Sequence, residues 1–471
     1  MFKDLPRYDQ RKSAGQWVSE IPAHWEWAPA RTLFQERREN SSDDEQLLSV
    51  TIGRGVIPQA ELLSSTSKKD SSNTDKSKYK LVRTGDLVYN KMRAWQGAAG
   101  LSRYSGIVSP AYIVMTPRRD EAEYFHHLVR TPMFAKEAER WSYGITSDQW
   151  SLRPEHFKMI RFPVPPAEEQ AAIVKYLAHA NARIDKAITA KRRLIALLNE
   201  QVATEVEALV TGSEISKQHE NQNPWIRSTP DKWSLMRIKH VLRGMEQGWS
   251  PQCDAQPAGD HEWGVLKVGC SNHGRFRASE NKRLPEWLTP REDLEVQDGD
   301  LLVSRANTRD LVGSAAVALN PPPRLIFSDK TFRLQTRSSL ADSQFLALAM
   351  AARSSRDQIE SGSVGASHSM QNIGQGVIAN LWIALPSLEE QREIVRLVSE
   401  RSAPIEKTIA RTEREIALLQ EFRTRLVADV VTGQVDVREI AATLPEAPGA
   451  VLDLVADTDD ALEEVLESVD A

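Results

Sequence analysis

The chain contains one long stretch twice, and this repeat limits the possible folds more than any other feature of the sequence. The first copy runs from Pro165 to Gly212 and the second from Pro386 to Gly433, and one constant shift aligns them without a gap. Both copies open on proline followed by two glutamates and a glutamine, and both end at Thr-Gly. An ungapped match of this length is an internal repeat, so the same structural unit is expected twice.

Each copy is predicted to form one long helix. A proline is tolerated in a first helical turn, paired glutamates suit the positive end of the helix dipole, and the final glycines are the expected C-caps. Apolar residues recur at steps of three, four and seven. In the first copy they are Ile184, Ile188, Ile195, Leu198, Val202, Val206 and Leu209, and in the second Ile405, Ile409, Ile416, Leu419, Leu426 and Val430.

Such a narrow apolar stripe is typical of a coiled-coil seam. The helix from residue 184 to residue 211 is roughly 40 Å long, at about 1.5 Å per residue. The two copies are therefore expected to pack on each other. The alternative is that each stripe packs on its own globular domain.

Two mixed globules precede the two helices, so the sequence predicts an α+β chain with the order globule, helix, globule, helix. Both globules begin with Pro-x-x-Trp, at Pro22 and Pro230, and both contain a Gly-Asp turn leading into a strand. One amphipathic helix is predicted in each, at 121–138 and 342–359. The expected domains are residues 1–164, 165–212, 213–385 and 386–433, followed by a tail, 434–471. Between these shared features the globules differ, which suggests that they recognise two different things.

The charge distribution permits a nucleic-acid partner. The net charge is −5, but ten acidic residues and no lysine or arginine lie between Glu439 and the C-terminus, so the rest of the chain is mildly basic. The tail is expected to be acidic and mobile. Two cysteines fit a reducing cytosol, and no apolar run is long enough to span a membrane. A cytoplasmic location is therefore expected.

These features together resemble the DNA specificity subunits of type I restriction-modification systems. The resemblance rests on the twin Pro-x-x-Glu-Gln starts, on Ile184-Asp185-Lys186 with its counterpart Ile405-Glu406-Lys407, on the Leu-Leu-x-Glu runs, on the Thr-Gly ends and on the Pro-x-x-Trp starts. It covers about residues 15 to 440. Each motif is loose alone, but their duplicated order is specific.

The resemblance implies two target-recognition domains, each binding one half of a bipartite double-stranded DNA sequence, with the helices as an antiparallel coiled-coil spacer. It also implies docking of two adenine methyltransferase subunits and the addition of motor-nuclease subunits. S-adenosylmethionine, ATP and Mg²⁺ would belong to those partners, and this chain would be non-catalytic. A spacer of roughly 40 Å suits half-sites one DNA turn, roughly 34–36 Å, apart.

Specific DNA contacts need Arg, Lys, Asn or Gln at base edges, with basic and hydroxyl side chains on phosphates. Such residues follow the Gly-Asp turns and occupy the loop before each long helix, where recognition residues usually lie. The first globule offers Asn90, Lys91, Arg93, Gln96, Tyr143, Thr146 and Ser147, and the second offers Ser304, Arg305, Asn307, Arg309, Ser367, His368 and Gln371. A further set is Lys267, Asn272 and Arg275. For each of them, the alternative is a solvated polar side chain.

Signals for chemistry are weak. The run from Asn320 to Pro323 is similar to the Asn-Pro-Pro-aromatic motif of amino-methyltransferases, but Pro323 replaces the aromatic residue that would stack on a flipped base. A proline turn is therefore expected there. The sequence contains no Walker phosphate-binding loop, so an ATPase is not expected. An autonomous methyltransferase would need a glycine-rich cofactor loop, which the sequence also lacks.

No metal site is expected. Four possible ligands occur in the second globule, Cys253, His261, Cys270 and His273. They lack the paired spacing of a zinc site. The alternative function is a coiled-coil scaffold whose globules bind proteins rather than DNA. That alternative predicts no salt-dependent DNA binding, whereas contacts to several phosphates make the affinity fall steeply with salt.

Overall fold

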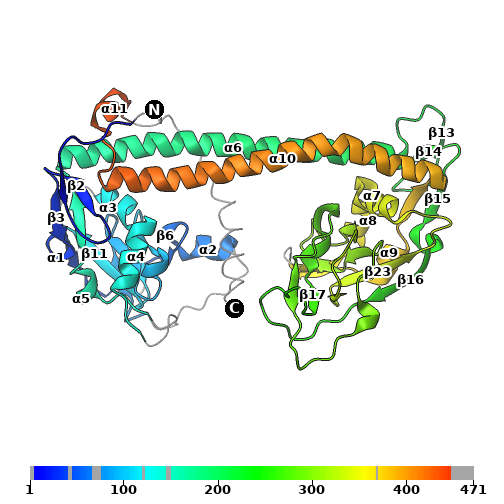
Figure 1. Ribbon diagram of the computed structural model, residues 1–471, viewed down its shortest axis with the longest axis horizontal. Helices are drawn as coiled ribbons and strands as arrows, with labels where there is room; N and C mark the ends of the chain where they lie inside the picture. The colour runs from blue at the N-terminus through cyan, green and yellow to red at the C-terminus, as the bar shows by residue number, and fades with distance from the viewer. Residues whose placement is uncertain are drawn as a thin grey trace. The chain divides into compact units, whose positions relative to one another are not determined.

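The computed structural model describes residues 5–40, 45–65, 76–118, 122–144, 150–367 and 370–446. It divides into two compact units. Unit 1 joins Met1–Arg192 to Glu413–Ala471, and unit 2 is Arg193–Thr412. Each unit therefore combines one globule with part of both long helices (Figure 1).

The two predicted long helices are present, as α6 (Ala167–Thr211) and α10 (Leu388–Val431). The predicted C-cap glycines follow them in the left-handed conformation, with φ of +67° at Gly212 and +69° at Gly433. Glycine adopts this conformation without steric cost, so it ends a helix where other residues would be strained.

The helices pack antiparallel within unit 1. Lys191 Nζ of α6 lies 2.5 Å from Glu415 Oε2 of α10, and Asp185 of α6 pairs with Arg423 of α10. As the residue number falls along α6, that of its partner rises along α10, which is the antiparallel pairing that was predicted.

The two interpretations of the apolar stripe are both partly right. Ile184 and Ile188, at the start of the stripe in α6, are buried outside the globule cores. Nearer the helix ends, Leu426 and Val430 of α10 belong to the core of unit 1, and Val206 of α6 belongs to the core of unit 2. The stripe of α6 is therefore buried outside the globule cores at its start, where α6 pairs with α10, and packs on a globule near its end.

Unit 1 is built on a four-stranded antiparallel sheet. Its strand order is β4 (Phe34–Glu36), β11 (Tyr112–Pro117), β8 (Leu87–Asn90) and β9 (Ala99–Leu101). Four antiparallel pairs complete the described strands: β1 (Arg11–Ser13) with β2 (Glu20–Pro22), β3 (Glu26–Pro29) with β12 (Arg161–Val164), β5 (Leu48–Thr51) with β6 (Gly55–Pro58), and β7 (Lys80–Val82) with β10 (Gly106–Val108). The helices besides α6 and α10 are α1 (Ala30–Leu33), α2 (Gln59–Ser65), the 3-10 helix η1 (Ala94–Gln96), α3 (Ala122–Val129), α4 (Pro132–Arg140), α5 (Pro154–Phe157) and α11 (Arg438–Thr443).

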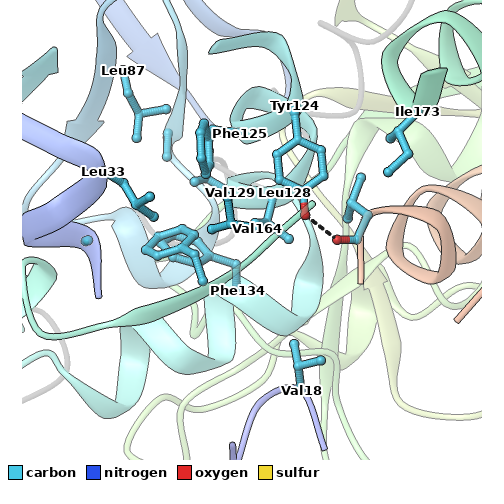
Figure 2. Packing of buried hydrophobic residues seen from close by; sticks show 14 of the residues in the cluster. Val18, Leu33, Leu87, Tyr124, Phe125, Leu128, Val129, Phe134, Val164 and Ile173 are labelled. Atoms are coloured by element: carbon cyan, nitrogen blue, oxygen red, sulfur yellow. Dashed lines mark hydrogen bonds between the residues drawn. The ribbon is translucent and has the colours of Figure 1, made fainter. Parts of the chain in front are cut away.

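Aromatic side chains fill the core of unit 1 (Figure 2). Phe34 and Phe125 pack edge to face, with 5.0 Å between ring centroids, and Phe134 packs against the same group. Complete burial of one such ring contributes about 1.5–3 kcal/mol. Tyr124 is fully buried, and its hydroxyl lies 2.8 Å from the Val431 carbonyl oxygen at the end of α10. This hydrogen bond satisfies the one polar atom of a core ring and ties the core to the long helix.

Unit 2 repeats this plan. Its four-stranded antiparallel sheet has the order β16 (Leu242–Gln247), β23 (Thr331–Thr336), β19 (Leu301–Ser304) and β21 (Ala315–Val317). The smaller sheets are β13 (Gln218–Glu220) with β14 (Ser228–Pro230), β15 (Ser234–Arg237) with β26 (Trp382–Leu385), β18 (Asn281–Arg283) with β17 (Gly264–Leu266) and β22 (Leu325–Phe327), and β20 (Ala306–Asn307) with β25 (Met370–Asn372) and β24 (Val364–Ser367). The short helices are α7 (Ser343–Ala351), α8 (Arg353–Gly362), α9 (Gln375–Ala379), η3 (Ile238–Val241), η4 (Val268–Gly274) and η5 (Glu292–Leu294).

The prediction of a single amphipathic helix in each globule is wrong. In unit 1 the segment forms α3 and α4, because Pro132 occupies the first turn of α4 and Thr131 caps it by accepting a hydrogen bond from Phe134 N at 3.2 Å. Proline has no amide hydrogen to donate and therefore starts a helix more readily than it continues one. In unit 2 the break between α7 and α8 lies at Ala352, which has an extended backbone.

The Pro-x-x-Trp motif of the first globule joins both long helices. The indole nitrogen of the buried Trp25 donates to Glu169 Oε1 at 2.9 Å, in the first turn of α6. The end of α10 packs on the same motif. A Cβ atom added to Gly433 would lie 2.4 Å from Pro22 Cδ and 3.1 Å from Trp25 Cη2.

Unit 2 repeats this arrangement with the helices exchanged. A Cβ atom on Gly212, at the end of α6, would lie 2.5 Å from Pro230 Cγ and 3.1 Å from Trp233 Cη2. Each tryptophan thus packs on the end of one long helix, and it is the helix that does not directly follow its globule. This contact requires the two helices to run antiparallel.

The predicted mobile tail is not uniform. Residues 434–446 pack on unit 1, where Val437 and Ala441 are buried and His179 Nε2 of α6 lies 2.8 Å from the Pro445 carbonyl oxygen. Asp436 N also donates to Pro6 O at 2.8 Å, so this segment contacts the N-terminal part of the chain. The acidic residues from 447 onwards lie outside the described residues. Within the described ranges, the helices are too short or too polar to cross a membrane.

Candidate nucleic-acid interface

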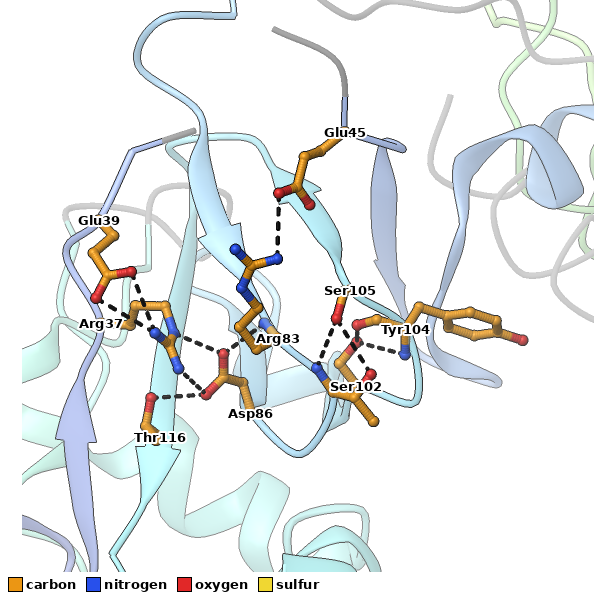
Figure 3. Close-up of polar contacts among 10 residues, drawn as sticks. Arg37, Glu39, Glu45, Arg83, Asp86, Ser102, Tyr104, Ser105 and Thr116 are labelled. Atoms are coloured by element: carbon orange, nitrogen blue, oxygen red, sulfur yellow. Dashed lines mark hydrogen bonds and ion pairs between the residues drawn. The ribbon is translucent and has the colours of Figure 1, made fainter. Parts of the chain in front are cut away.

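A buried aspartate fixes the Gly-Asp turn of unit 1 (Figure 3). Asp86 accepts hydrogen bonds from Arg37 Nε at 2.8 Å, from Thr116 Oγ1 at 2.7 Å and from the Arg83 amide at 2.8 Å. These bonds compensate the carboxylate for its loss of hydration. Because β8 starts directly after Asp86, the network sets the position at which β8 ends, in the candidate segment.

The Gly-Asp turn of unit 2 is built in the same way. Asp300 accepts from the Gln297 amide at 2.9 Å and from Arg333 at 3.3 Å. In both units a backbone amide three residues earlier and an arginine hold the aspartate, and that arginine directly follows β4 in unit 1 and lies in β23 in unit 2. The matched Gly-Asp turns therefore position the strands that carry the candidate residues, and Asp86 is buried whereas Asp300 is partly exposed.

Lys91 and Arg305 occupy equivalent positions. The Lys91 amide donates to Ala111 O at 3.2 Å, and its carbonyl accepts from Leu152 N at 2.8 Å. The backbone of Arg305 makes the two corresponding bonds in unit 2. Each basic residue is thus held by its backbone between the end of a central strand and the segment that leads to the long helix.

In unit 2 the Arg305 amide donates to Lys330 O at 2.7 Å, and the Arg305 carbonyl accepts from Ile373 N at 3.0 Å. A hairpin lies beside this position in both units. Tyr143 bridges Ser151 in unit 1, and Val364 pairs with Asn372 in unit 2. The same shift that aligns the two long helices also aligns these hairpins.

Three candidates, Thr146, Ser147 and His368, lie outside the described residues. Ser367 ends β24, and its backbone alone is described. Contact between these four residues and DNA stays a prediction from sequence.

In unit 1 the structure brings Lys91 and Tyr143 together. Both line a cavity of about 570 Å³, and Lys80 and Arg153 line it as well. Burial lowers the pKa of Lys80, whose ammonium group donates to Tyr112 O at 2.7 Å. The cavity therefore combines three basic residues and the exposed Tyr143 ring with the carboxylates of Glu36 and Glu155. Basic groups near an aromatic ring are a combination that suits a nucleic acid.

The other three candidates of this globule do not line that cavity. Asn90 Oδ1 accepts from Met92 N at 2.9 Å, so its side chain is partly engaged by its own backbone turn. Arg93 is exposed at the N-terminus of η1. Gln96 is half-buried at the end of η1.

In unit 2 the structure brings four candidates together. Asn307 of β20 lies directly opposite Gln371 of β25. Asn307 Nδ2 is 3.3 Å from Ser304 Oγ, and Ser304 is fully buried. Arg309 and Gln371 line a cavity of about 210 Å³ with Glu360, which pairs with Arg309 at 3.1 Å.

The side chains of the further set of candidates, Lys267, Asn272 and Arg275, have different surroundings. Asn272 Oδ1 accepts from Asn307 Nδ2 at 2.9 Å, so Asn272 joins the candidate cluster of unit 2. Arg275 instead pairs with Glu406 of α10 at 2.7 Å, which ties the globule to the long helix. Lys267 precedes η4 and is half-buried.

Sequence reasoning missed a basic group in unit 1. A second cavity has a volume of about 310 Å³. Four basic residues from distant parts of the sequence line it: Arg31, Arg38, Arg118 and Lys158. The Arg-Arg doublets at 37–38 and 118–119 are a signal that could have pointed to it.

Two exposed leucines occupy equivalent positions of the repeat. Leu197 of α6, in unit 2, is 54% exposed, and Leu418 of α10, in unit 1, is 62% exposed. Large apolar side chains at matched exposed positions suggest one kind of docking surface in two copies. In the described part of the chain, no three His, Cys, Asp or Glu side chains are placed to hold a metal ion.

Comparison with known proteins relates the chain to one group. It is 30% identical over 210 residues to the EcoEI type I restriction enzyme specificity subunit of Escherichia coli, which covers 43% of this chain and 35% of that protein. It is 23% identical over 382 residues to the MjaVIII specificity subunit of Methanocaldococcus jannaschii, covering 77% of this chain and 84% of the relative. The chain thus matches only about a third of the length of the E. coli relative.

A solved structure described as the basis of complex assembly and conformational transition of the type I R-M system has the same fold, with a TM-score of 0.54 and 18% identity. The alignment covers 88% of this chain and 99% of that one. No protein-family model matches the chain.

The fold and the paired candidate surfaces define a two-module α+β protein whose modules share two antiparallel helices. The curated relatives that it resembles are specificity subunits of type I restriction-modification systems.

Proposed function

We propose that this chain is the sequence-specific DNA-binding subunit of a type I restriction-modification complex. Each globule reads one half of a bipartite site, and the long helices set the separation of the two halves. The proposal rests on the similarity to specificity subunits and on the backbone framework that the two units share.

The observation that carries the proposal is that one backbone framework presents different side chains in the two units. Lys91 and Arg305 occupy equivalent positions, but Lys91 lies beside an aromatic ring, whereas Arg305 precedes the Asn307–Gln371 pair. Side-chain amides, guanidinium and ammonium groups are those that read base edges in the major groove. Equal frameworks with unequal reading groups suit two different half-sites.

The experiment that tests the function is methylation profiling of DNA from cells that express this chain with a cognate methyltransferase subunit. A bipartite motif with a fixed gap, lost when this chain is deleted, is the expected result. Methylation that survives the deletion, or a motif without a gap, would refute the proposal and favour the protein-binding scaffold.

Substitution of each of the two equivalent basic residues should weaken binding through one half-site and leave binding through the other unchanged. Lys91→Ala should weaken binding of the complete complex by about tenfold to a hundredfold through one half-site, since a good base contact contributes about 1–3 kcal/mol. Arg305→Ala should do the same through the other half. Fluorescence anisotropy with duplexes that carry either half-site scrambled measures both effects.

Two exposed residues serve as controls, Lys136→Ala for unit 1 and Arg291→Ala for unit 2, since neither lines a described candidate cavity. Both should bind all duplexes as the unsubstituted protein does. If Lys91→Ala and Arg305→Ala weaken all duplexes equally, these residues contact phosphates and do not read sequence.

The partners are proposed to be two adenine methyltransferase subunits and motor-nuclease subunits. The two equivalent exposed leucines supply matched apolar positions for the methyltransferase copies. S-adenosylmethionine, ATP and Mg²⁺ would be bound by these partners, and this chain would act without catalytic residues, in the cytoplasm with the DNA.

A negative charge introduced at either leucine should prevent one methyltransferase subunit from binding. Leu418→Glu should reduce the number of bound methyltransferase subunits from two to one, because burial of an unpaired carboxylate at an interface is costly. Leu197→Glu should remove the other copy. Native mass spectrometry of the purified complex counts the subunits.

The matched control is Asn199→Glu, which adds the same charge to an exposed position about two residues further along α6 and so on another face. It should retain both subunits. Retention of both subunits by Leu197→Glu and Leu418→Glu would show that the partners dock elsewhere.

A further inference from the structure

The second cavity of unit 1 has an unbalanced charge. Among the described residues that line it, four are basic, Arg31, Arg38, Arg118 and Lys158, and one is acidic, Glu36. Lys158 Nζ lies 2.8 Å from Glu36 Oε2, and Arg38 NH2 lies 3.0 Å from the same oxygen. One carboxylate therefore serves two cations.

The electrostatics of Glu36 agree with this geometry. Burial acts to raise the pKa of Glu36, but hydrogen bonds from Lys158 and Arg38 outweigh burial and hold the pKa below its ordinary value. Glu36 is therefore ionised at neutral pH, and its single negative charge cannot balance both partners. The cluster keeps a net positive charge.

The other two cations make contacts that do not neutralise them. Arg118 Nε donates to the Phe34 carbonyl oxygen at 3.3 Å, and Arg31 NH1 lies 3.6 Å from Met159 Sδ. A carbonyl oxygen and a thioether are both uncharged. Both arginines are exposed, so their guanidinium groups are accessible to an anion from solvent.

The basic cavity continues into the candidate interface. Glu36 lines this cavity and also the larger one that holds Lys91 and Tyr143. Glu36 belongs to the edge strand β4 and Arg31 to α1. Arg38 lies two residues beyond β4, Arg118 directly follows β11, and Lys158 directly follows α5. The basic cavity and the cavity that holds Lys91 therefore adjoin at Glu36.

We propose that Arg38 and Arg118, with Arg31 and Lys158, bind backbone phosphates of the DNA duplex beside the half-site read by unit 1. The inference rests on the proposed function and assigns a positioning surface outside the predicted reading segments. Guanidinium groups bind phosphate oxygens through paired charge-assisted hydrogen bonds. Phosphate contacts fix the register of a protein on DNA without reading its sequence.

The test is the salt dependence of DNA binding by the complete complex that contains Arg38→Ala and Arg118→Ala together. The slope of log K against log salt should become shallower by about 0.9 for each phosphate that is no longer neutralised, so by about 1 to 2 for the pair. The methylated motif should not change. The control is Arg103→Ala, an exposed arginine of unit 1 that lines neither cavity and should keep the slope.

The outcomes separate this inference from the proposed function. If the unsubstituted complex does not bind DNA, the proposed function fails. If it binds and the double variant has an unchanged slope while its thermal unfolding matches that of the unsubstituted protein, the phosphate surface is refuted. Titration of inorganic phosphate, followed by ³¹P NMR, identifies the other source of this chemistry: tight binding that disappears in the double variant, with an unchanged DNA slope, would assign the cavity to a small phosphorylated ligand and overturn the inference.

Discussion

Gly433→Ala should destabilise unit 1 by about 2–5 kcal/mol. The left-handed conformation at this position costs a non-glycine residue about 1–2 kcal/mol, and a methyl group forced into a packed site costs about 1–3 kcal/mol more. The new Cβ would lie 2.4 Å from Pro22 Cδ and 3.1 Å from Trp25 Cη2. Both rings are rigid and buried, so neither can move aside cheaply. Denaturant unfolding followed by tryptophan fluorescence measures the loss.

The chain offers a matched control in Gly85. This glycine also has a positive φ, of +94°, but a Cβ atom added to it would meet no atom within 4 Å. Gly85→Ala therefore carries the backbone cost alone, about 1–2 kcal/mol. Gly212→Ala should behave like Gly433→Ala, because it packs on Pro230 and Trp233 in the same way. Equal losses for Gly433→Ala and Gly85→Ala would mean that the contact with the Pro-x-x-Trp motif adds nothing to stability.

Asp86→Ala should destabilise unit 1 by about 3–5 kcal/mol, the cost of removing one partner of a buried ion pair. Asp86 is 1% exposed, and its removal leaves Arg37 with only the exposed Glu39 and leaves Thr116 Oγ1 and the Arg83 amide without their acceptor. An unpaired donor away from water pays its full desolvation cost. Because Asp86 precedes β8, the position of Lys91 should also change, and binding through the unit 1 half-site should weaken. Denaturant unfolding measures the first effect and fluorescence anisotropy the second.

The double variant Arg37→Met with Asp86→Leu tests whether the loss of stability comes from the unpaired charge of Arg37 or from another role of Asp86. Replacement of both charges by apolar groups of similar size removes the unpaired guanidinium group, so part of the stability should return, while Thr116 Oγ1 and the Arg83 amide still lack their acceptor. Glu39→Ala is the control, because Glu39 pairs with the same arginine at 3.4 Å from an exposed position and should cost less than about 1 kcal/mol. If the double variant is as unstable as Asp86→Ala, the aspartate acts by more than its charge.

Much of the fold was predictable because its signals are local. The repeat and its apolar periodicity indicated α6 and α10, and the left-handed conformation at Gly212 and Gly433 is a property that glycine brings to any context. Pro132 indicated the break between α3 and α4, but the helical periodicity of the whole segment predicted one continuous helix.

The candidate site was less predictable because it depends on distant contacts. Lys91 and Arg305 stand at equivalent positions, but Ser304 is fully buried and Arg275 pairs with α10. Polarity predicts that a side chain seeks a polar partner, and it does not say whether that partner is solvent, DNA or another residue. The basic cavity joins Arg31, Arg118 and other cations that only the sheet brings together.

The sequence by itself determined two equal helices, their cap glycines and two related globules, because repeats, periodicity and backbone conformation act over a few turns. Only the tertiary structure decided that Trp25 packs on the end of α10 and Trp233 on the end of α6. Either pairing satisfies the local preferences of both motifs. The choice is made by the burial of the apolar stripes and by the ion pairs along the helices, which form together only when the whole chain has folded.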